Sequence, residues 1–245
     1  IVWRIDMKMI SIIGSLKAYY YLLAVDGQID DKEMQCFKEI CMETDDTATE
    51  YLDELLAECD EVLKKAAGNE YEEIVQEAFD KVILNETTKD IKSIPARLLL
   101  WNMLVLAYAN NEYSSSEQKM IGHASRILSV DKSVFMEMEQ MARTAATISK
   151  ELFDFEQSDR PYRVIRPIVD ELEKRLKVLF HAAKCLICDE TEADESYEAK
   201  EKQNKIADAM INAGSAISDT AVNAGNKIGG LLKGIKNKNN DKEMK

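Results

Sequence analysis

Two short stretches of the chain share one pattern and decide its fold. Residues 23–33 read Leu-Ala-Val-Asp-Gly-Gln-Ile-Asp-Asp-Lys-Glu, and residues 107–117 read Ala-Tyr-Ala-Asn-Asn-Glu-Tyr-Ser-Ser-Ser-Glu. In each stretch an apolar segment ends at a tight turn, after which a capping residue is followed three positions later by Glu, the signature of a helix start. Asn tolerates the left-handed backbone that Gly supplies, so both turns can have the same shape. The pattern predicts a helix-turn-helix unit that occurs twice, 84 residues apart.

Apolar residues at helical spacing extend outward from both stretches. Ile10, Ile13, Leu16, Tyr20 and Leu23 recur every three or four positions, which predicts an amphipathic first helix. The same spacing predicts further helices over 30–41, 47–65, 70–84, 98–109, 134–155 and 162–188. Residues 85–95 are expected to form a connection. With only three prolines and nine glycines, the composition favours long helices. We expect an all-α fold, a helical bundle with two repeated helix-turn-helix units plus long C-terminal helices.

Charge and cysteine content narrow the function classes. The formal charge of −13 excludes a general nucleic-acid binder, because neutralising phosphates requires a basic surface. Five cysteines without framework spacing indicate a reducing compartment, so we expect a cytoplasmic protein. The apolar stretches 9–25 and 96–109 are shorter than the roughly 20 residues that a membrane span requires.

The chain divides into four predicted segments. Residues 1–157 are expected to form the helical bundle, and residues 158–190 an additional long helix that packs on it or extends from it. Residues 191–203 are an acidic linker. Residues 204–245 form a tail with an 11-residue repeat, a period that keeps one apolar face on a nearly straight helix.

The tail has the character of a surface-binding segment. Its repeat places three isoleucines in one register, Ile206, Ile217 and Ile228. The tail also carries the lysines Lys227, Lys233, Lys236 and Lys238. Such a helix can lie on an anionic membrane or dock on a partner helix. Five glycines and an Ala-rich apolar face weaken helix formation, so conditional disorder is a third alternative.

The two stretches, 23–33 and 107–117, resemble the TerB (tellurite resistance) family, over roughly residues 10–140. The resemblance implies a helical bundle of two helix-turn-helix units. It also implies a role in tellurite resistance or in wider chemical-stress and phage-defence systems, at the inner face of the membrane, with divalent cation binding. The chain departs from the family pattern where Asn110 and Asn111 replace Asp-Gly, and in about 100 residues that follow the domain.

The first turn is a candidate cation site. Asp26, Asp30 and Glu33 place carboxylates where a hard cation such as calcium finds oxygen ligands, although the spacing is not that of an EF-hand. If the two units pack about a pseudo-twofold axis, Asn110 and Glu117 complete the site from the other side. The alternative is that the acidic residues only cap a helix and interact favourably with its dipole.

A second candidate is a thiol or zinc site. His181, Cys185 and Cys188 offer three soft ligands on neighbouring turns of one helix, whereas a structural zinc site has four. The alternatives are ordinary helix cysteines and a zinc ion shared between two chains.

No pattern for catalysis is present. The chain has two histidines and contains neither a glycine-rich phosphate loop nor a nucleophile elbow. We therefore expect a non-enzymatic scaffold of the stress or defence type that binds a divalent cation and recruits membrane or protein partners through its tail. The alternative is a purely structural interaction module without metal, and the oligomeric state is open.

Overall fold

The computed structural model describes residues 8–66, 70–85, 92–110 and 112–188, and these residues are predominantly helical. The elements in chain order are β1 (Met9–Ser11), α1 (Ile12–Ala24), α2 (Asp31–Thr44), the 3-10 helix η1 (Ala48–Glu50), α3 (Leu52–Leu63), α4 (Tyr71–Asn85), β2 (Ser93–Pro95), α5 (Ala96–Ala107), α6 (Ser115–Ile127), α7 (Lys132–Glu156) and α8 (Tyr162–Cys188). The expected all-α class is confirmed. Within the described ranges, no helix is long and apolar enough to cross a membrane.

The helix-turn-helix unit occurs twice, as the sequence predicts. The strand, first helix and second helix of the first unit begin at residues 9, 12 and 31, and those of the second unit at 93, 96 and 115, always 84 positions later. β1 and β2 pair antiparallel, with Ile10 opposite its own counterpart Ile94. A pairing of equivalent residues is what a pseudo-twofold axis through this ribbon requires.

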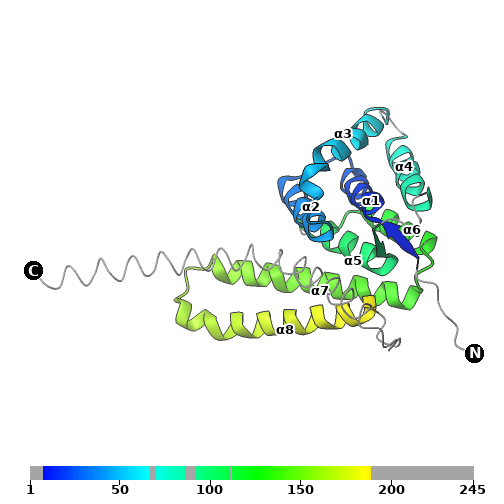
Figure 1. The fold of residues 1–245 in the computed structure, drawn as a ribbon. Coiled ribbons are helices and arrows are strands. Elements are labelled where there is room, and N and C mark those ends of the chain that lie inside the picture. Colours follow the sequence, from blue (N-terminus) through cyan, green and yellow to red (C-terminus); the bar gives the residue numbers. More distant parts are fainter. Residues whose placement is uncertain (1–7, 67–69, 86–91, 111, 189–245) are drawn as a thin grey trace, which may run out of the picture.

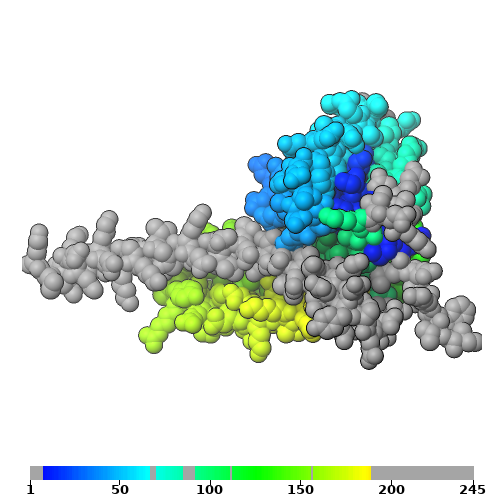
Figure 2. Space-filling model, in the orientation of Figure 1, coloured from blue at the N-terminus to red at the C-terminus, as the bar shows by residue number. Residues whose placement is uncertain are grey.

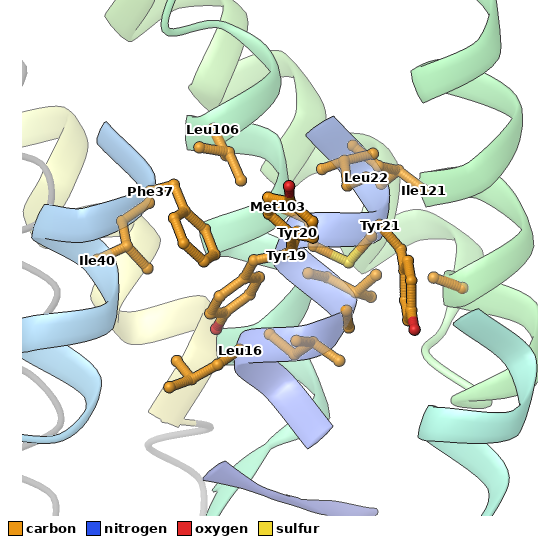
Figure 3. Close-up of a cluster of buried hydrophobic side chains, with 14 of the residues drawn as sticks. Leu16, Tyr19, Tyr20, Tyr21, Leu22, Phe37, Ile40, Met103, Leu106 and Ile121 are labelled. Atoms are coloured by element: carbon orange, nitrogen blue, oxygen red, sulfur yellow. The ribbon is translucent and has the colours of Figure 1, made fainter. Parts of the chain in front are cut away.

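The core lies between the first helices of the two units. α1 and α5 are buried on nearly all sides, and α1 also contacts α2, α3, α4 and α6. Figure 3 shows part of this core, in which Tyr19 and Tyr20 of α1 lie near Phe37 of α2. Asn102, the polar residue in the apolar α5, donates a hydrogen bond to the Tyr19 hydroxyl (2.9 Å), whereas its buried Oδ1 has no hydrogen-bond partner among the described residues. The turns at the ends of α1 and α5 therefore both follow helices that lie in the core.

Two differences from the predicted elements have local causes. The first helix begins only at Ile12, because Met9–Ser11 forms a strand instead and Ser11 caps the helix by accepting from the Gly14 N–H. The helix predicted over 47–65 is interrupted, since the Asp45 carboxylate accepts from the Thr47 N–H and hydroxyl and from the Tyr51 hydroxyl. These bonds fold the segment into η1 before α3 begins at Leu52.

The last two helices form a long antiparallel hairpin that extends away from the rest of the bundle (Figure 1). α7 begins after its cap Asp131, whose carboxylate accepts from the Ser133 N–H. Pro167 lies inside α8 near its start, and it does not delay the helix, which begins at Tyr162. Proline lacks the N–H that would donate to a carbonyl oxygen in the first turn of α8. That turn is exposed, so water can donate to the carbonyl oxygen instead.

Gly27 supplies the one special backbone angle of the first turn, a φ of +80°. A Cβ at this position would have room, since its nearest neighbour is Tyr71 Cε1 at 3.9 Å, so the cost of a side chain is conformational only. We expect Gly27→Ala to lower the free energy of unfolding by about 1 kcal/mol. Gly27→Asn should cost less, because Asn tolerates the left-handed region. Denaturant unfolding measures both, and an equal loss for the two variants would contradict the conformational cause.

Candidate functional site

The first acidic turn is built by local hydrogen bonds. The Asp26 carboxylate accepts from the Gln28 N–H (2.9 Å), which closes the turn at the end of α1. Asp30 caps α2 by accepting from the N–H groups of Lys32 (2.7 Å) and Glu33 (2.8 Å). Glu33 Oε2 in return accepts from the Asp30 N–H (3.0 Å), which completes a capping box. The predicted capping roles of Asp30 and Glu33 are therefore confirmed.

The second turn repeats this geometry with different side chains. Asn110 Oδ1 accepts from the Glu112 N–H (2.6 Å), as Asp26 does from Gln28. The Ser114 hydroxyl accepts from the Glu117 N–H (3.2 Å), and Glu117 Oε2 accepts from the Ser114 N–H (2.7 Å). The replacement of aspartate by asparagine thus preserves the turn.

A hydrogen bond joins the two turns directly. Asn110 Nδ2 donates to Glu33 Oε1 at 2.6 Å, across 77 positions of sequence. Glu33 and Glu117 are 4% and 3% exposed, respectively, so both carboxyl groups lie inside the protein. The structure therefore brings Glu33 together with Asn110 of the other unit, while the cation site proposed for these residues stays a prediction.

The electrostatics of the two buried glutamates reflect this proximity. Burial raises the pKa of Glu117 to about 7, and the negative charges of Glu33 and Asp26 raise it further against the opposing hydrogen bonds from Ser114. Burial also raises the pKa of Glu33, together with the charges of Asp30 and Asp26, while hydrogen bonds from Asp30 and Asn110 oppose the rise. Asp26, Glu33 and Glu117 thus form one coupled acidic cluster.

The two halves of this cluster differ in one respect. Glu33 receives an amide donor from Asn110 of the opposite unit, whereas the counterpart of Asn110 in the first unit is Asp26, a carboxylate that repels Glu117. An amide stabilises an ionised neighbour, while a carboxylate destabilises it. Asp26 raises the pKa of both glutamates, but only Glu33 has the amide donor of Asn110 against that repulsion.

Tyr71 of α4 supports the first turn in a way that the sequence patterns did not indicate. Its hydroxyl donates to the carbonyl oxygen of Ala24 at the end of α1 (2.7 Å). Burial raises the pKa of Tyr71, and so does the charge of Asp26. A tyrosine at the start of a separate helix gives no local sequence signal for this contact.

A second polar cluster was also missed. Asp80 of α4 lies 2.9 Å and 3.2 Å, through its two carboxylate oxygens, from Nε2 of His123 on α6, and it accepts from Gln76. The pair ties α4 to α6 beside the second unit. Neither residue stands in a recognisable motif, so only the packed structure brings them together.

The metal predictions are not decided by this geometry. Among the described residues, no group of three or more His, Cys, Asp or Glu side chains is arranged to hold a metal ion. On α8, His181 is exposed while Cys185 and Cys188 are half-buried. The zinc hypothesis stays a prediction. The tail residues from Ile206 to Lys238 lie outside the described residues.

The fold and its paired turns define a helical bundle made of two related helix-turn-helix units. The sequence model of one family, described as tellurite resistance protein TerB, matches residues 18–140, half of the 245-residue chain, including both acidic turns. The chain belongs to the TerB family. The comparisons with curated proteins and with solved structures gave no match.

Proposed function

We propose that the protein is a TerB-like scaffold of a stress or defence system that binds a divalent cation at its paired acidic turns. The observation that carries the proposal is the coupled cluster of Asp26, Glu33 and Glu117, in which a buried carboxyl group faces negative charge. TerB domains are generally non-catalytic, which agrees with a binding role.

The ligand types favour a hard cation. Carboxylate and amide oxygens are the donors that calcium prefers, and calcium takes six to eight of them in flexible geometry, with water completing the shell. Glu117, Glu33 and Asp26 are the central ligands of the proposed site, because a cation would remove the repulsion that Glu33 and Asp26 exert on Glu117. Asn110 would then provide a further oxygen after a small rearrangement, with Asp30 at the edge.

The proposal includes recruitment by the tail. The isoleucine register and the lysines of residues 204–245 support docking on an anionic membrane surface or on protein partners, with the protein in the cytoplasm. This part of the proposal rests on the sequence pattern alone.

Calorimetric titration of calcium into the chelator-stripped protein tests the cation site. We expect stoichiometric binding that the double variant Asp26→Asn/Glu33→Gln loses, because it removes two of the three clustered charges. The matched control is Asp31→Asn/Glu39→Gln, which changes the net charge equally at an exposed and a half-buried position of α2 and should bind as the unaltered protein does. Absence of heat at millimolar calcium would refute the cation site.

The second candidate function is a structural interaction module without metal. It is favoured by the two complete capping boxes, since Glu33 and Glu117 already satisfy backbone N–H groups and lie at helix N-termini, where the helix dipole stabilises negative charge. The same titration separates the candidates. A protein that gives no heat, yet loses stability when Glu33 or Glu117 is replaced by Ala, has acidic turns that serve only the fold.

A further inference from the structure

The hairpin of α7 and α8 has its own apolar core beyond the bundle. Three residues from each helix, Ala145, Ile148, Leu152, Val169, Leu172 and Leu176, form a buried cluster separate from the main core. The hairpin is here called the arm, and Figure 2 shows its helix α8 along the lower edge of the molecule. A two-helix hairpin buries little surface on its own, so further helices packed against an arm stabilise it.

α8 carries two apolar stripes, and α7 covers only one of them. The inner stripe includes Ile165, Val169, Leu172 and Leu176, all of which are buried. The outer stripe begins one residue earlier and repeats with the same alternating spacing of four and three, through Val164, Ile168, Glu171, Arg175, Val178 and Ala182. Val164, Ile168 and Val178 are 60%, 39% and 64% exposed, values unusual for three large aliphatic residues on one helix face.

The outer stripe lies on the side of α8 turned away from the bundle. Phe180 contacts Trp101 of α5 edge to face, with ring centroids 6.4 Å apart. Val178, two positions earlier on a helix that advances about 100° per residue, therefore points to nearly the opposite side. Glu171 and Arg175 on the stripe form no ion pair with another described residue.

We propose that the outer stripe of α8 binds the same stripe of a second copy of this chain, with the two helices antiparallel. When the twofold axis passes beside residue 173, Val164 lies opposite Ala182 of the other copy, Ile168 opposite Val178, and Glu171 opposite Arg175. Every apolar residue then meets an apolar residue, and each charge meets its opposite. The two arms together form a four-helix bundle, the arrangement that antiparallel hairpins commonly adopt.

The charge pattern favours this occupant over others. The stripe carries one acidic and one basic residue and so has no net charge, which gives an anionic membrane surface no electrostatic advantage. If the lysine-rich tail docked on the stripe, its lysines would be attracted by Glu171 and repelled by Arg175, with no net gain. Only a partner with the reversed order of apolar and charged positions satisfies the whole stripe, and an antiparallel copy provides that order.

Reversing the charges of Glu171 and Arg175 in the full chain tests whether the outer stripes of two copies pair. Sedimentation velocity at increasing protein concentration should show a reversible monomer-dimer equilibrium. We expect Glu171→Arg and Arg175→Glu each to raise the dimer dissociation constant roughly tenfold, because both symmetry-related pairs become repulsive. The double variant Glu171→Arg/Arg175→Glu should restore dimerisation. An equimolar mixture of the two single variants should form a heterodimer, in which all facing charges are again opposite.

The control and the contradicting outcomes follow from the same geometry. Lys177→Glu makes the same kind of charge change as Arg175→Glu at an exposed position off the stripe, and it should leave the dissociation constant unchanged. All these positions are exposed, and circular dichroism confirms that each variant remains folded. A protein that stays monomeric, a dimer indifferent to the single changes, or single variants that neither the double change nor mixing restores would each overturn the proposal.

Discussion

Asn110→Asp should destabilise the protein by about 2–4 kcal/mol at pH 7.5 in the presence of a chelator. The change replaces the amide that donates to Glu33 Oε1 at 2.6 Å by a carboxylate, next to a group that is only 4% exposed. An aspartate retains an oxygen that can accept from the Glu112 N–H, so the turn itself is preserved. Denaturant unfolding in chelator therefore measures the loss of the donor together with the added repulsion.

Calcium gives this variant a diagnostic value. If the acidic turns bind a cation, Asn110→Asp adds a further carboxylate ligand, and millimolar calcium should recover much of the lost stability by mass action. If the turns are only structural, calcium should leave the deficit unchanged while acidification to pH 5 reduces it. Unaltered stability in chelator would contradict the importance of the contact between the two turns.

The control for Asn110→Asp is an exposed version of the same interaction. Gln35 Nε2 donates to Glu39 Oε1 at 2.9 Å on the solvent face of α2. Gln35→Glu makes the equivalent amide-to-carboxylate change there and should cost only a few tenths of a kcal/mol, about what an exposed like-charged pair on a helix costs. The difference between the two variants isolates the contribution of burial.

The sequence was sufficient to predict the parts of the site that depend on local bonds. A capping box links residues three positions apart, so the pairs Asp30 with Glu33 and Ser114 with Glu117 are visible in the sequence as they are in the structure. The 84-residue repeat is also a sequence property, and it predicted two similar units whose turns could meet. The bond between Asn110 and Glu33 agrees with that prediction.

Other features depend on tertiary contacts and had no such signal. The strands β1 and β2 have three residues each and continue the apolar runs of the helices that follow them, so the sequence pattern assigns them to a helix and to a connection. Their pairing is fixed by the way in which two units related by a twofold axis meet at Ile10 and Ile94. The pair of Asp80 with His123 likewise depends on how α4 packs beside α6.

The roles of the long C-terminal helices were only partly predictable. The helical spacing of apolar residues predicted the bounds of α8, Tyr162 to Cys188, correctly. The outer stripe is interrupted by Glu171 and Arg175 and therefore looks like an ordinary solvated face in the sequence. Only the placement of α7 and α5 on other sides of α8 shows that Val164, Ile168 and Val178 are left without cover by the described part of the chain.

Glu117→Gln should stabilise the protein at pH 8 and leave its stability at pH 4.5 nearly unchanged. The folded-state pKa of Glu117 is about 7, above the ordinary value of 4.5, so the folded protein holds a proton that the unfolded chain releases between these values. The stability that protonation provides is fully present below pH 4.5 and is lost as the pH rises through 7. Glutamine resembles the protonated form, and it still serves as the partner in a capping box.

The size of the effect follows from the same linkage. A shift from 4.5 to about 7 corresponds to a stabilisation of at most about 3 kcal/mol for the variant at pH 8. The measurement is the difference in unfolding free energy between the variant and the unaltered protein at several pH values, because Glu33 and other groups add the same background slope to both. Glu151→Gln, at an exposed position on α7, is the matched control and should show no such rise.

A divalent cation should reduce the difference in unfolding free energy between Glu117→Gln and the unaltered protein if the proposed site exists. A cation bound beside Glu117 favours the ionised carboxylate, so calcium stabilises the unaltered protein at pH 8 more than the variant. Either result, a smaller difference or an unchanged one, reports on the contact between Glu117 and Asp26. Asp26 is the counterpart in the first unit of Asn110, which donates to Glu33. A variant less stable than the unaltered protein at pH 8 without calcium would mean that Glu117 is ionised and well solvated there. The asymmetry between the two turns would then have no energetic consequence.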